Sequence, residues 1–195
     1  MTLATPTRGV EIIEPFPPHA LPRAWKWAQE SRRQVADAFA PSTLDQFVEH
    51  WERQVRAGQR SWGVWRDAEL GGIVTSMRFN AVLADAHCIF KRTFWGHETT
   101  AEALRLVFTE IFAGGVQKIT TVCFSDNHAL LGLVRRIGFE REGTLKKNAL
   151  RDGDLCDQAV IGLTRDRFME TEAVRMESPA QVAEPTKNEV TECRS

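Results

Sequence analysis

The middle of the chain changes hydrophobic period twice, and this change constrains the fold more than any other feature. Residues 81–90 and 118–124 are apolar runs of strand length, and the second run is rich in β-branched residues. Between them, residues 99–113 place apolar side chains on one helical face, and Gly114-Gly115 follows as a stop signal. The order strand, helix, strand predicts a βαβ crossover inside an α/β domain.

Further elements are expected on both sides of this unit. The first are two helices, at residues 21–39 and 42–57, the second opened by Ser42 and Asp45 as a capping box. Local patterns also predict strands at residues 10–13, 61–66, 69–79, 139–145 and 155–163, a short helix at 129–137, turns at Asp67-Ala68 and Asp152-Gly153, and a bulge at Gly71-Gly72.

These elements fit one domain, which we place at residues 10–169. Residues 1–9 are expected to be flexible. Residues 170–195 hold few large apolar groups and an excess of acids, so they cannot bury enough surface to offset the entropy of ordering. We therefore expect a disordered acidic tail after residue 169.

Charge and cysteine usage narrow the classes of function. The net charge of −1 gives no general preference for nucleic acid or for a membrane surface. The four cysteines lie far apart without zinc spacing, so no metal site is expected, and a reducing cytoplasm is the simplest location. The chain holds no apolar run near the roughly 20 residues that span a bilayer, and residues 1–10 lack a signal-peptide core.

Two segments around the crossover carry a family pattern. The first, at the start of the predicted helix, is Phe94-Trp95-Gly96-His97-Glu98-Thr99-Thr100-Ala101-Glu102-Ala103-Leu104, and the second combines Asn127-His128-Ala129 with Ile137-Gly138-Phe139 and Glu142-Gly143. In this order and spacing the chain resembles the GNAT N-acetyltransferases over residues 8–165, nearest to the branch that acetylates ribosomal proteins and other N-terminal amines. The resemblance implies the GNAT fold, with a mixed, mostly antiparallel central sheet and flanking helices. It also implies an acyltransferase that uses acetyl-CoA.

The same resemblance places the pyrophosphate of acetyl-CoA on the turn before the helix at residues 99–113. Helix N-termini suit anions, because their first N–H groups lack internal partners and the helix dipole adds partial positive charge. This copy of the turn is degenerate, because Glu98 stands where Gly is expected and Thr100 where Gly or Ala is expected. Glu98 brings a carboxylate towards a diphosphate, and such like charges repel by roughly 1 kcal/mol or more.

Two interpretations of the turn stay open. In the first, it binds phosphate through the residues Trp95, Gly96, His97, Glu98, Thr99 and Thr100. Thr99 would then cap the helix with Glu102 as its capping-box partner, the Thr99 and Thr100 hydroxyls would donate to phosphate, and positive charge would come from His97, Lys91 and Arg92. In the second, Glu98 simply favours the dipole of an ordinary helix N-terminus.

Asn127 matches the family asparagine that contacts the pantetheine arm or orders its loop, although asparagine is also common at helix entries. His87 is the preferred general base, because its strand faces the acetyl group in the family and the unperturbed pKa of histidine, about 6.5, suits the task. Asp126 is the second choice, and an ordinary surface histidine is the alternative for His87.

The usual general acid is missing. The chain has no tyrosine, and Leu130 stands where this branch often has serine. Ser125 is the nearest hydroxyl, and Cys123 lies close to it in the sequence.

The resemblance therefore implies transfer of an acetyl group from acetyl-CoA to a primary amine by direct attack. The acceptor would be a small-molecule amine or a protein N-terminus. The alternative is a GNAT-fold binding or structural protein without catalysis, such as those associated with phages and virions, because the turn is altered and tyrosine is absent. Another acyl-CoA as donor is a third option. Tryptophans on helix faces and an exposed sheet edge would permit a homodimer.

Overall fold

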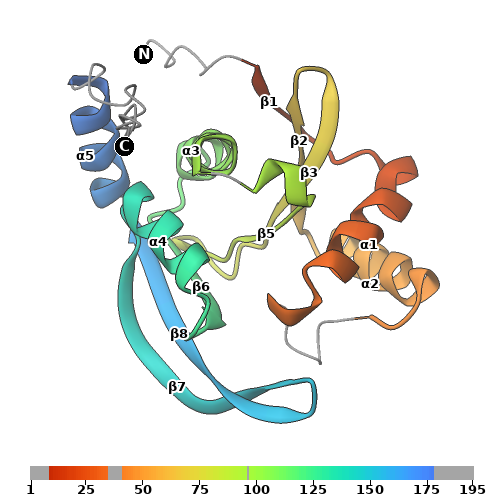
Figure 1. Ribbon diagram of the computed structural model, residues 1–195. Helices are drawn as coiled ribbons and strands as arrows, with labels where there is room; N and C mark the ends of the chain where they lie inside the picture. The colour runs from red at the N-terminus through yellow and green to blue at the C-terminus, as the bar shows by residue number, and fades with distance from the viewer. Residues whose placement is uncertain (1–8, 35–40, 96, 178–195) are drawn as a thin grey trace, which may run out of the picture.

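The computed structural model describes residues 9–34, 41–95 and 97–177, which form two sheets with helices packed around them (Figure 1). In chain order the elements are β1 (Val10–Ile13), η1 (Pro18–Ala20), α1 (Leu21–Glu30), η2 (Arg32–Gln34), α2 (Leu44–Arg56), β2 (Arg60–Arg66), β3 (Glu69–Ser76), β4 (Leu83–Ala84), β5 (His87–Phe90), η4 (Arg92–Phe94), α3 (His97–Ala113), β6 (Lys118–Phe124), α4 (His128–Ile137), β7 (Glu140–Arg151), β8 (Asp154–Thr164) and α5 (Arg165–Glu177).

The first sheet has the strand order β1-β2-β3-β5 and is antiparallel throughout. The second has the order β4-β6-β8-β7, in which β4 and β6 are parallel and the other pairs are antiparallel. A mixed, mostly antiparallel arrangement was expected, and the crossover from β4 through α3 to β6 is confirmed. The predicted strands and helices at 118–124, 129–137 and 99–113 agree with β6, α4 and α3 within two residues.

The predicted strand at residues 81–90 is wrong as one element, because it is divided between the two sheets. The break falls at Asp85-Ala86, where Asp85 is bonded to the end of β3. Its N–H donates to Met77 O at 2.9 Å, and the Met77 N–H donates to Asp85 Oδ1 at 2.6 Å. These bonds turn the chain from the second sheet into the first.

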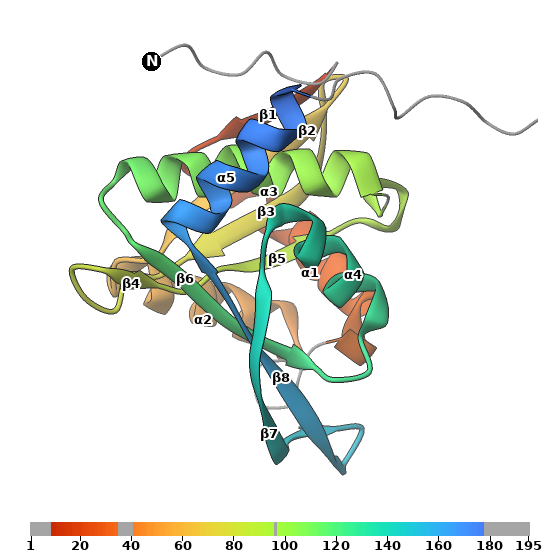
Figure 2. The same ribbon diagram turned by 90° about the vertical axis from the view of Figure 1, so that its left-hand side faces the viewer.

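Beyond this break, β5 and β6 diverge, and the two strands do not pair with each other (Figure 2). The Lys91 N–H donates to Gly71 O at 2.9 Å, which sets the phase of the ladder between β3 and β5. Bonded and non-bonded pairs alternate in an antiparallel ladder. His87 therefore bonds to β3, whereas the main-chain groups of Cys88 and Phe90 point away from β3 along the free edge.

The predicted bulge at Gly71-Gly72 is confirmed, because the register between β2 and β3 skips Gly71. Both glycines make room for aromatic rings of the segment that leads to α3. A Cβ on Gly71 would lie 2.4 Å from the ring of Phe94, and one on Gly72 would lie 2.3 Å from the ring of Phe90. The sequence at the bulge thus determines how closely β5 and η4 approach β3.

Two apolar clusters hold the helices to the sheets. The larger lies under α3, α4 and α5 and includes Phe94, Phe108 and Phe168. The smaller packs α1 and α2 on the other face of the first sheet and includes Trp27 and Trp51. These two tryptophans are buried, so they serve packing rather than the walls of an open pocket.

Three element boundaries differ from expectation. The predicted helix at 21–39 ends at Glu30, because Ser31 and the basic residues after it offer no apolar face; residues 35–40 lie outside the described residues. The cap of α2 is Thr43 rather than Ser42, with Thr43 Oγ1 accepting from Gln46 N–H at 3.2 Å. The strands β7 and β8 are longer than predicted and run up to the predicted turn at Asp152-Gly153. Their ladder continues past a bulge at residues 146–148 that faces Asp157.

The predicted disordered tail also needs correction, because α5 continues to Glu177. Phe168 inserts between Phe108 and Phe112, with ring centroids 6.4 and 5.3 Å away. Residues 1–8 and 178–195 lie outside the described residues.

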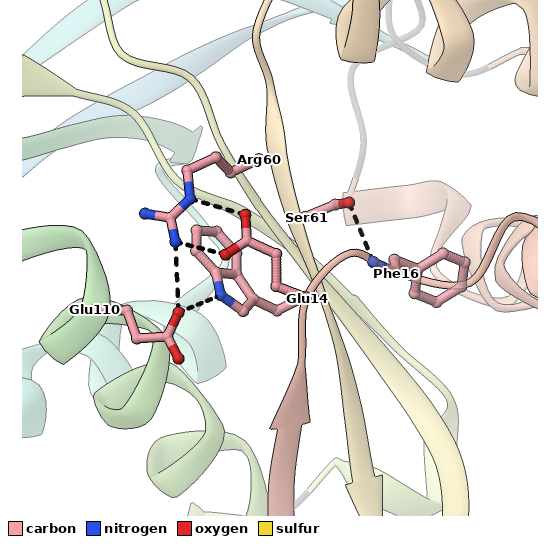
Figure 3. A network of polar contacts seen from close by, with 6 residues as sticks. Glu14, Phe16, Arg60, Ser61 and Glu110 are labelled. Atoms are coloured by element: carbon pink, nitrogen blue, oxygen red, sulfur yellow. Dashed lines mark hydrogen bonds and ion pairs between the residues drawn. The ribbon is translucent and has the colours of Figure 1, made fainter. Parts of the chain in front are cut away.

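A polar network ties β1 and β2 to the C-terminal half of α3 (Figure 3). Arg60 donates to both carboxylate oxygens of Glu14, at 2.8 and 2.5 Å, and this pairing raises the pKa of Arg60. The indole N–H of the fully buried Trp62 donates to Glu110 Oε2 at 2.7 Å, and Arg60 reaches the same oxygen at 3.4 Å. The N-terminal half of α3, which begins beside the site described next, is free of this network.

Candidate active site

The turn that leads into α3 is anchored by Phe94, the last residue of η4. Phe94 is fully buried, and two cations lie over its ring, with Arg66 Cζ at 4.6 Å and Lys91 Nζ at 5.0 Å from the ring centroid. The room for this ring comes from Gly71 on β3. Cation–π contacts of this kind contribute roughly 0.5–2 kcal/mol each. The turn is therefore held in place from below before any ligand binds.

Trp95 and Thr100 close the turn by bonds to the main chain. The Trp95 indole N–H donates to Phe90 O at 2.8 Å, so Trp95 covers the end of β5 while 43% of the residue stays exposed. The Thr100 hydroxyl donates to Phe94 O at 2.8 Å and is buried. This hydroxyl is therefore engaged within the protein, and its donation to phosphate stays a prediction. A threonine fits here because its side chain turns inward.

The expected capping box at Thr99 and Glu102 is wrong. The helix begins at His97, two residues before Thr99, and Thr99 Oγ1 accepts from Arg66 Nη1 at 3.0 Å. Glu102 is buried on the side of α5, near Arg175. Arg66 comes from the end of β2, and local sequence patterns gave no signal for this long-range contact.

The remaining residues near the turn differ in exposure and in charge pairing. Glu98 lies in the first turn of α3 with an exposed side chain, and it has no ion-pair partner among the described residues. The backbone of His97 starts the helix, whereas Gly96 lies outside the described residues. Lys91, expected to provide positive charge, pairs with Glu69 and thereby lowers the pKa of that carboxyl. Arg92 is exposed, with Cζ 5.8 Å from the Trp95 ring.

Asn127 caps α4 at the end of β6. Its Oδ1 accepts from Leu130 N–H at 3.2 Å, which is the helix-entry role expected as an alternative. Its Nδ2 makes no hydrogen bond within the described part of the chain. A contact with the pantetheine arm stays a prediction.

His87 lies on β5 with its side chain 57% exposed. Cys88 and Phe90 pack into the cluster under α3, so the alternation of the strand turns His87 and Ile89 to the opposite face. Ile89 packs against the cluster of α1 and α2, which confirms that this face is turned towards those helices. The Nε2 atom of His87 is 3.4 Å from Asp85 Oδ2.

Ser125 and Asp126 follow β6 in the second sheet. Ser125 Oγ accepts from Arg141 Nη2 at 3.4 Å, which uses a lone pair and leaves the hydroxyl proton free to be donated. Arg151 donates from Nη1 and Nη2 to the two carboxylate oxygens of Asp126, at 2.9 and 2.7 Å, and this lowers the pKa of the carboxyl. A carboxylate with a lowered pKa is a weak base, so Asp126 is disfavoured as the second-choice base.

Two more findings concern the neighbourhood of these residues. Burial raises the pKa of the Cys123 thiol, so this cysteine stays protonated and unreactive near neutral pH. His87 and Ser125 belong to different sheets, and no hydrogen bond joins them in the described residues. The structure brings together Phe94, Trp95, Thr99 and Thr100 at one end of α3, and it places Asn127 with Ser125 at the end of β6.

The sequence matches the family model of the GNAT acetyltransferase domain over residues 12–140, well over half of the chain. The chain belongs to the GNAT acetyltransferase family. This GNAT is therefore an acyltransferase by family, and its mixed, mostly antiparallel strands with a βαβ crossover and flanking helices are the structural features that the resemblance implied. No curated protein matches the sequence.

Solved structures with the same fold include acetyltransferases of different acceptors. Coenzyme A-bound RimL, a ribosomal L7/L12 alpha-N-protein acetyltransferase, superposes with a TM-score of 0.72 at 15% identity, covering 83% of this chain and 97% of that one. A ribosomal-protein-alanine N-acetyltransferase from Brucella melitensis gives 0.68 at 17% identity, with 79% and 99% covered. A chimera of the spermidine N-acetyltransferase SpeG from Vibrio cholerae and hSSAT gives 0.70 at 15% identity, with 83% and 99% covered. At these identities the likeness concerns the fold.

Neither a metal site nor a membrane-spanning helix is present within the described residues. No group of three or more His, Cys, Asp or Glu side chains there could hold a metal ion. None of the helices found there is long and apolar enough to cross a membrane.

Proposed function

We propose that this GNAT transfers an acetyl group from acetyl-CoA to a primary amine by direct attack of the amine on the thioester. One observation carries the proposal: the free main-chain edge of β5 runs directly into a turn that is anchored in advance and opens a helix. An extended pantetheine arm needs main-chain partners, and a diphosphate needs unpaired N–H groups, so the two features lie in the order that the cofactor requires.

The residues present fit acetyl-CoA. The free edge of β5 offers the main-chain groups of Cys88 and the N–H of Phe90, and the first turn of α3 offers the N–H groups of His97, Glu98 and Thr99. The Glu98 side chain is exposed, so it opposes the diphosphate by charge rather than by filling the turn. Bound acetyl-CoA would supply the activated acetyl group, and Asn127 Nδ2 would be free to bond its pantetheine arm.

Proton transfer is assigned to two residues of this chain. His87 lies on the face of β5 that is turned towards α1 and α2, and it would take the proton from the amine. Ser125, with its proton free, would protonate the leaving sulfur. Both roles are proposals, and they use a base and an acid from different sheets.

The acceptor is proposed as a primary amine, either a protein N-terminus or a small amine. The fold is shared with enzymes named for ribosomal-protein N-termini and with one named for spermidine, so it supports the class and does not select within it. The homodimer and the cytoplasmic location stay predictions.

The first experiment measures thermal unfolding with acetyl-CoA, with free CoA and without ligand. A ligand at about 100 times its Kd adds about 2.7 kcal/mol, which corresponds to a rise of about 5–10 °C for a chain of this size. Release of CoA thiol is then followed with N-terminal peptides and with polyamines as acceptors. Stabilisation by millimolar acetyl-CoA with thiol release on addition of an amine is the expected result; no stabilisation by either ligand would overturn the proposal.

A further inference from the structure

We propose that Asp85 is a positioning residue that fixes the tautomer of His87, so that Nδ1 of His87 is the nitrogen offered to the acceptor amine. The part of this inference that concerns proton transfer rests on the proposed acetyl transfer. The part that concerns the imidazole stands on the geometry alone.

The Asp85 carboxylate is held in place by its own surroundings. Its Oδ1 accepts from Met77 N–H at 2.6 Å, its main-chain O accepts from the Ser76 hydroxyl at 2.7 Å, and its N–H donates to Met77 O. These bonds come from the last residue of β3 and the residue after it. Asp85 Oδ2 remains, and it lies 3.4 Å from His87 Nε2. The carboxyl side chain is 18% exposed, which is far less than the imidazole it faces.

This arrangement selects one nitrogen of the imidazole. A carboxylate can only accept a hydrogen bond, so a neutral imidazole beside it carries its proton on Nε2 and its lone pair on Nδ1. Asp85 is the one charged side chain in ion-pair contact with His87 among the described residues.

The step that follows is balanced in atoms and electrons. As the amine nitrogen forms a bond to the acetyl carbonyl carbon, Nδ1 of His87 takes one proton from that nitrogen. The C–S bond then breaks, its electron pair leaves with the sulfur of CoA, and that sulfur takes a proton from the Ser125 hydroxyl or from water. Solvent returns a proton to the oxygen that gave one and takes the proton that His87 holds, so both residues end as they began. Nothing is oxidised or reduced.

The decisive measurement is the tautomer of His87 in protein labelled with 15N-histidine, at a pH where the ring is neutral. The chain has five histidines, and the signals of His87 are identified by their loss in His87→Gln. We expect Nε2–H in the wild type. In Asp85→Asn the side-chain oxygen can still accept from Met77 N–H, while the NH2 group faces the ring as a donor, so the proton should move to Nδ1. A wild-type ring protonated on Nδ1 would overturn the proposal.

Ser76→Ala is the matched control. It removes the bond from the Ser76 hydroxyl to Asp85 O without changing the carboxylate, so it tests the loop alone. We expect the wild-type tautomer in this variant. If Ser76→Ala changes the tautomer as Asp85→Asn does, the order of the loop rather than the carboxylate determines the ring, and the proposal is wrong.

Steady-state kinetics with the best amine separate this inference from the proposed function. Asp85→Asn should lower kcat by about tenfold or more, a part of the roughly 10²–10⁴-fold that a positioned base supplies, with the KM for acetyl-CoA unchanged. Ser76→Ala should stay within about threefold of the wild type. A wild-type protein without activity towards any amine would refute the proposed function and leave the tautomer result standing. An active protein whose Asp85→Asn variant keeps the wild-type kcat would refute the positioning role.

Discussion

Gly71→Ala should destabilise the protein and disturb the start of α3 together. The added Cβ would lie 2.4 Å from Cε2 and Cζ of Phe94 and 2.6 Å from Cδ2, closer than any real Cβ contact. Phe94 is fully buried with Arg66 and Lys91 over its ring, so the ring cannot move aside without breaking those contacts. The strain must therefore be taken up by η4, which carries Phe94 into the turn before α3.

The magnitude follows from the kind of clash. Overpacking a filled site costs about 1–3 kcal/mol, and a chain of this length loses roughly 2–4 °C in Tm per kcal/mol. We expect Gly71→Ala to melt about 2–12 °C below the wild type. Because η4 positions the first N–H groups of α3, the affinity for acetyl-CoA should fall as well.

The assay combines thermal melting with acetyl-CoA titration, and Gly132→Ala is the matched control. Gly132 lies in α4 with nothing within 4 Å of a Cβ, so the same substitution there should stabilise the protein by about 0.5–1 kcal/mol. Phe94→Leu, which shortens the clashing side chain, should make Gly71→Ala less costly. If Gly71→Ala melts with the wild type, or if the two changes are additive, the bulge does not hold Phe94 in the way argued above.

Three further predictions concern charges. Glu98→Gln should tighten acetyl-CoA binding about fivefold at low salt, because it removes roughly 1 kcal/mol of repulsion. The control Glu49→Gln on α2 should leave the Kd unchanged. If Glu98→Gln has the Kd of the wild type, the carboxylate lies away from the diphosphate. The lowered pKa of Asp126 stabilises the fold above the unfolded pKa of about 3.9, and this stability is lost as pH falls through the folded pKa. Asp126→Asn should therefore reduce the loss of unfolding free energy at acid pH by less than about 1 kcal/mol, since Asp126 is mostly exposed. If urea unfolding shows the same pH dependence for the variant as for the wild type, this counts against the pairing with Arg151. Glu110→Ala should lower the free energy of unfolding in urea by about 1–3 kcal/mol, because it leaves the buried Trp62 N–H without a partner. Glu110→Gln, which keeps an acceptor, should cost less. If both variants lose the same free energy, the effect belongs to Arg60 instead.

The parts of the fold that the sequence revealed are those that neighbouring residues determine. The helix α3, the strand β6 and the turn at Asp152-Gly153 follow from hydrophobic period and turn chemistry. Gly138, in a left-handed conformation at φ 106°, ends α4 as the local pattern indicates.

Residues that depend on distant contacts were missed or misread. Asp85 looked like one residue of a continuous strand, because its bonds to Ser76 and Met77 cross nine and eight residues of sequence. The sequence does carry one signal for the contact between Asp85 and His87. The two polar residues are two apart in an extended segment, so their side chains lie on one face of it. Arg66 gave no such signal, since its contact with Thr99 spans two elements.

The C-terminal helix shows why composition misjudged the segment after residue 169. Composition treats acidic and basic residues as solvated, and four of the eight residues at 170–177 are charged. In the structure Arg105 Nε is 3.0 Å from Glu172 Oε1, and Arg175 lies between Glu172 at 2.9 Å and the buried Glu102 at 3.6 Å. Together with Phe168, these pairs fasten α5 along α3, so charge that suggested disorder in the sequence becomes the means of docking. The two ends of α3 therefore differ in role: its first turn forms the proposed pyrophosphate site, while α5 and the Glu110 network hold the rest of the helix in place.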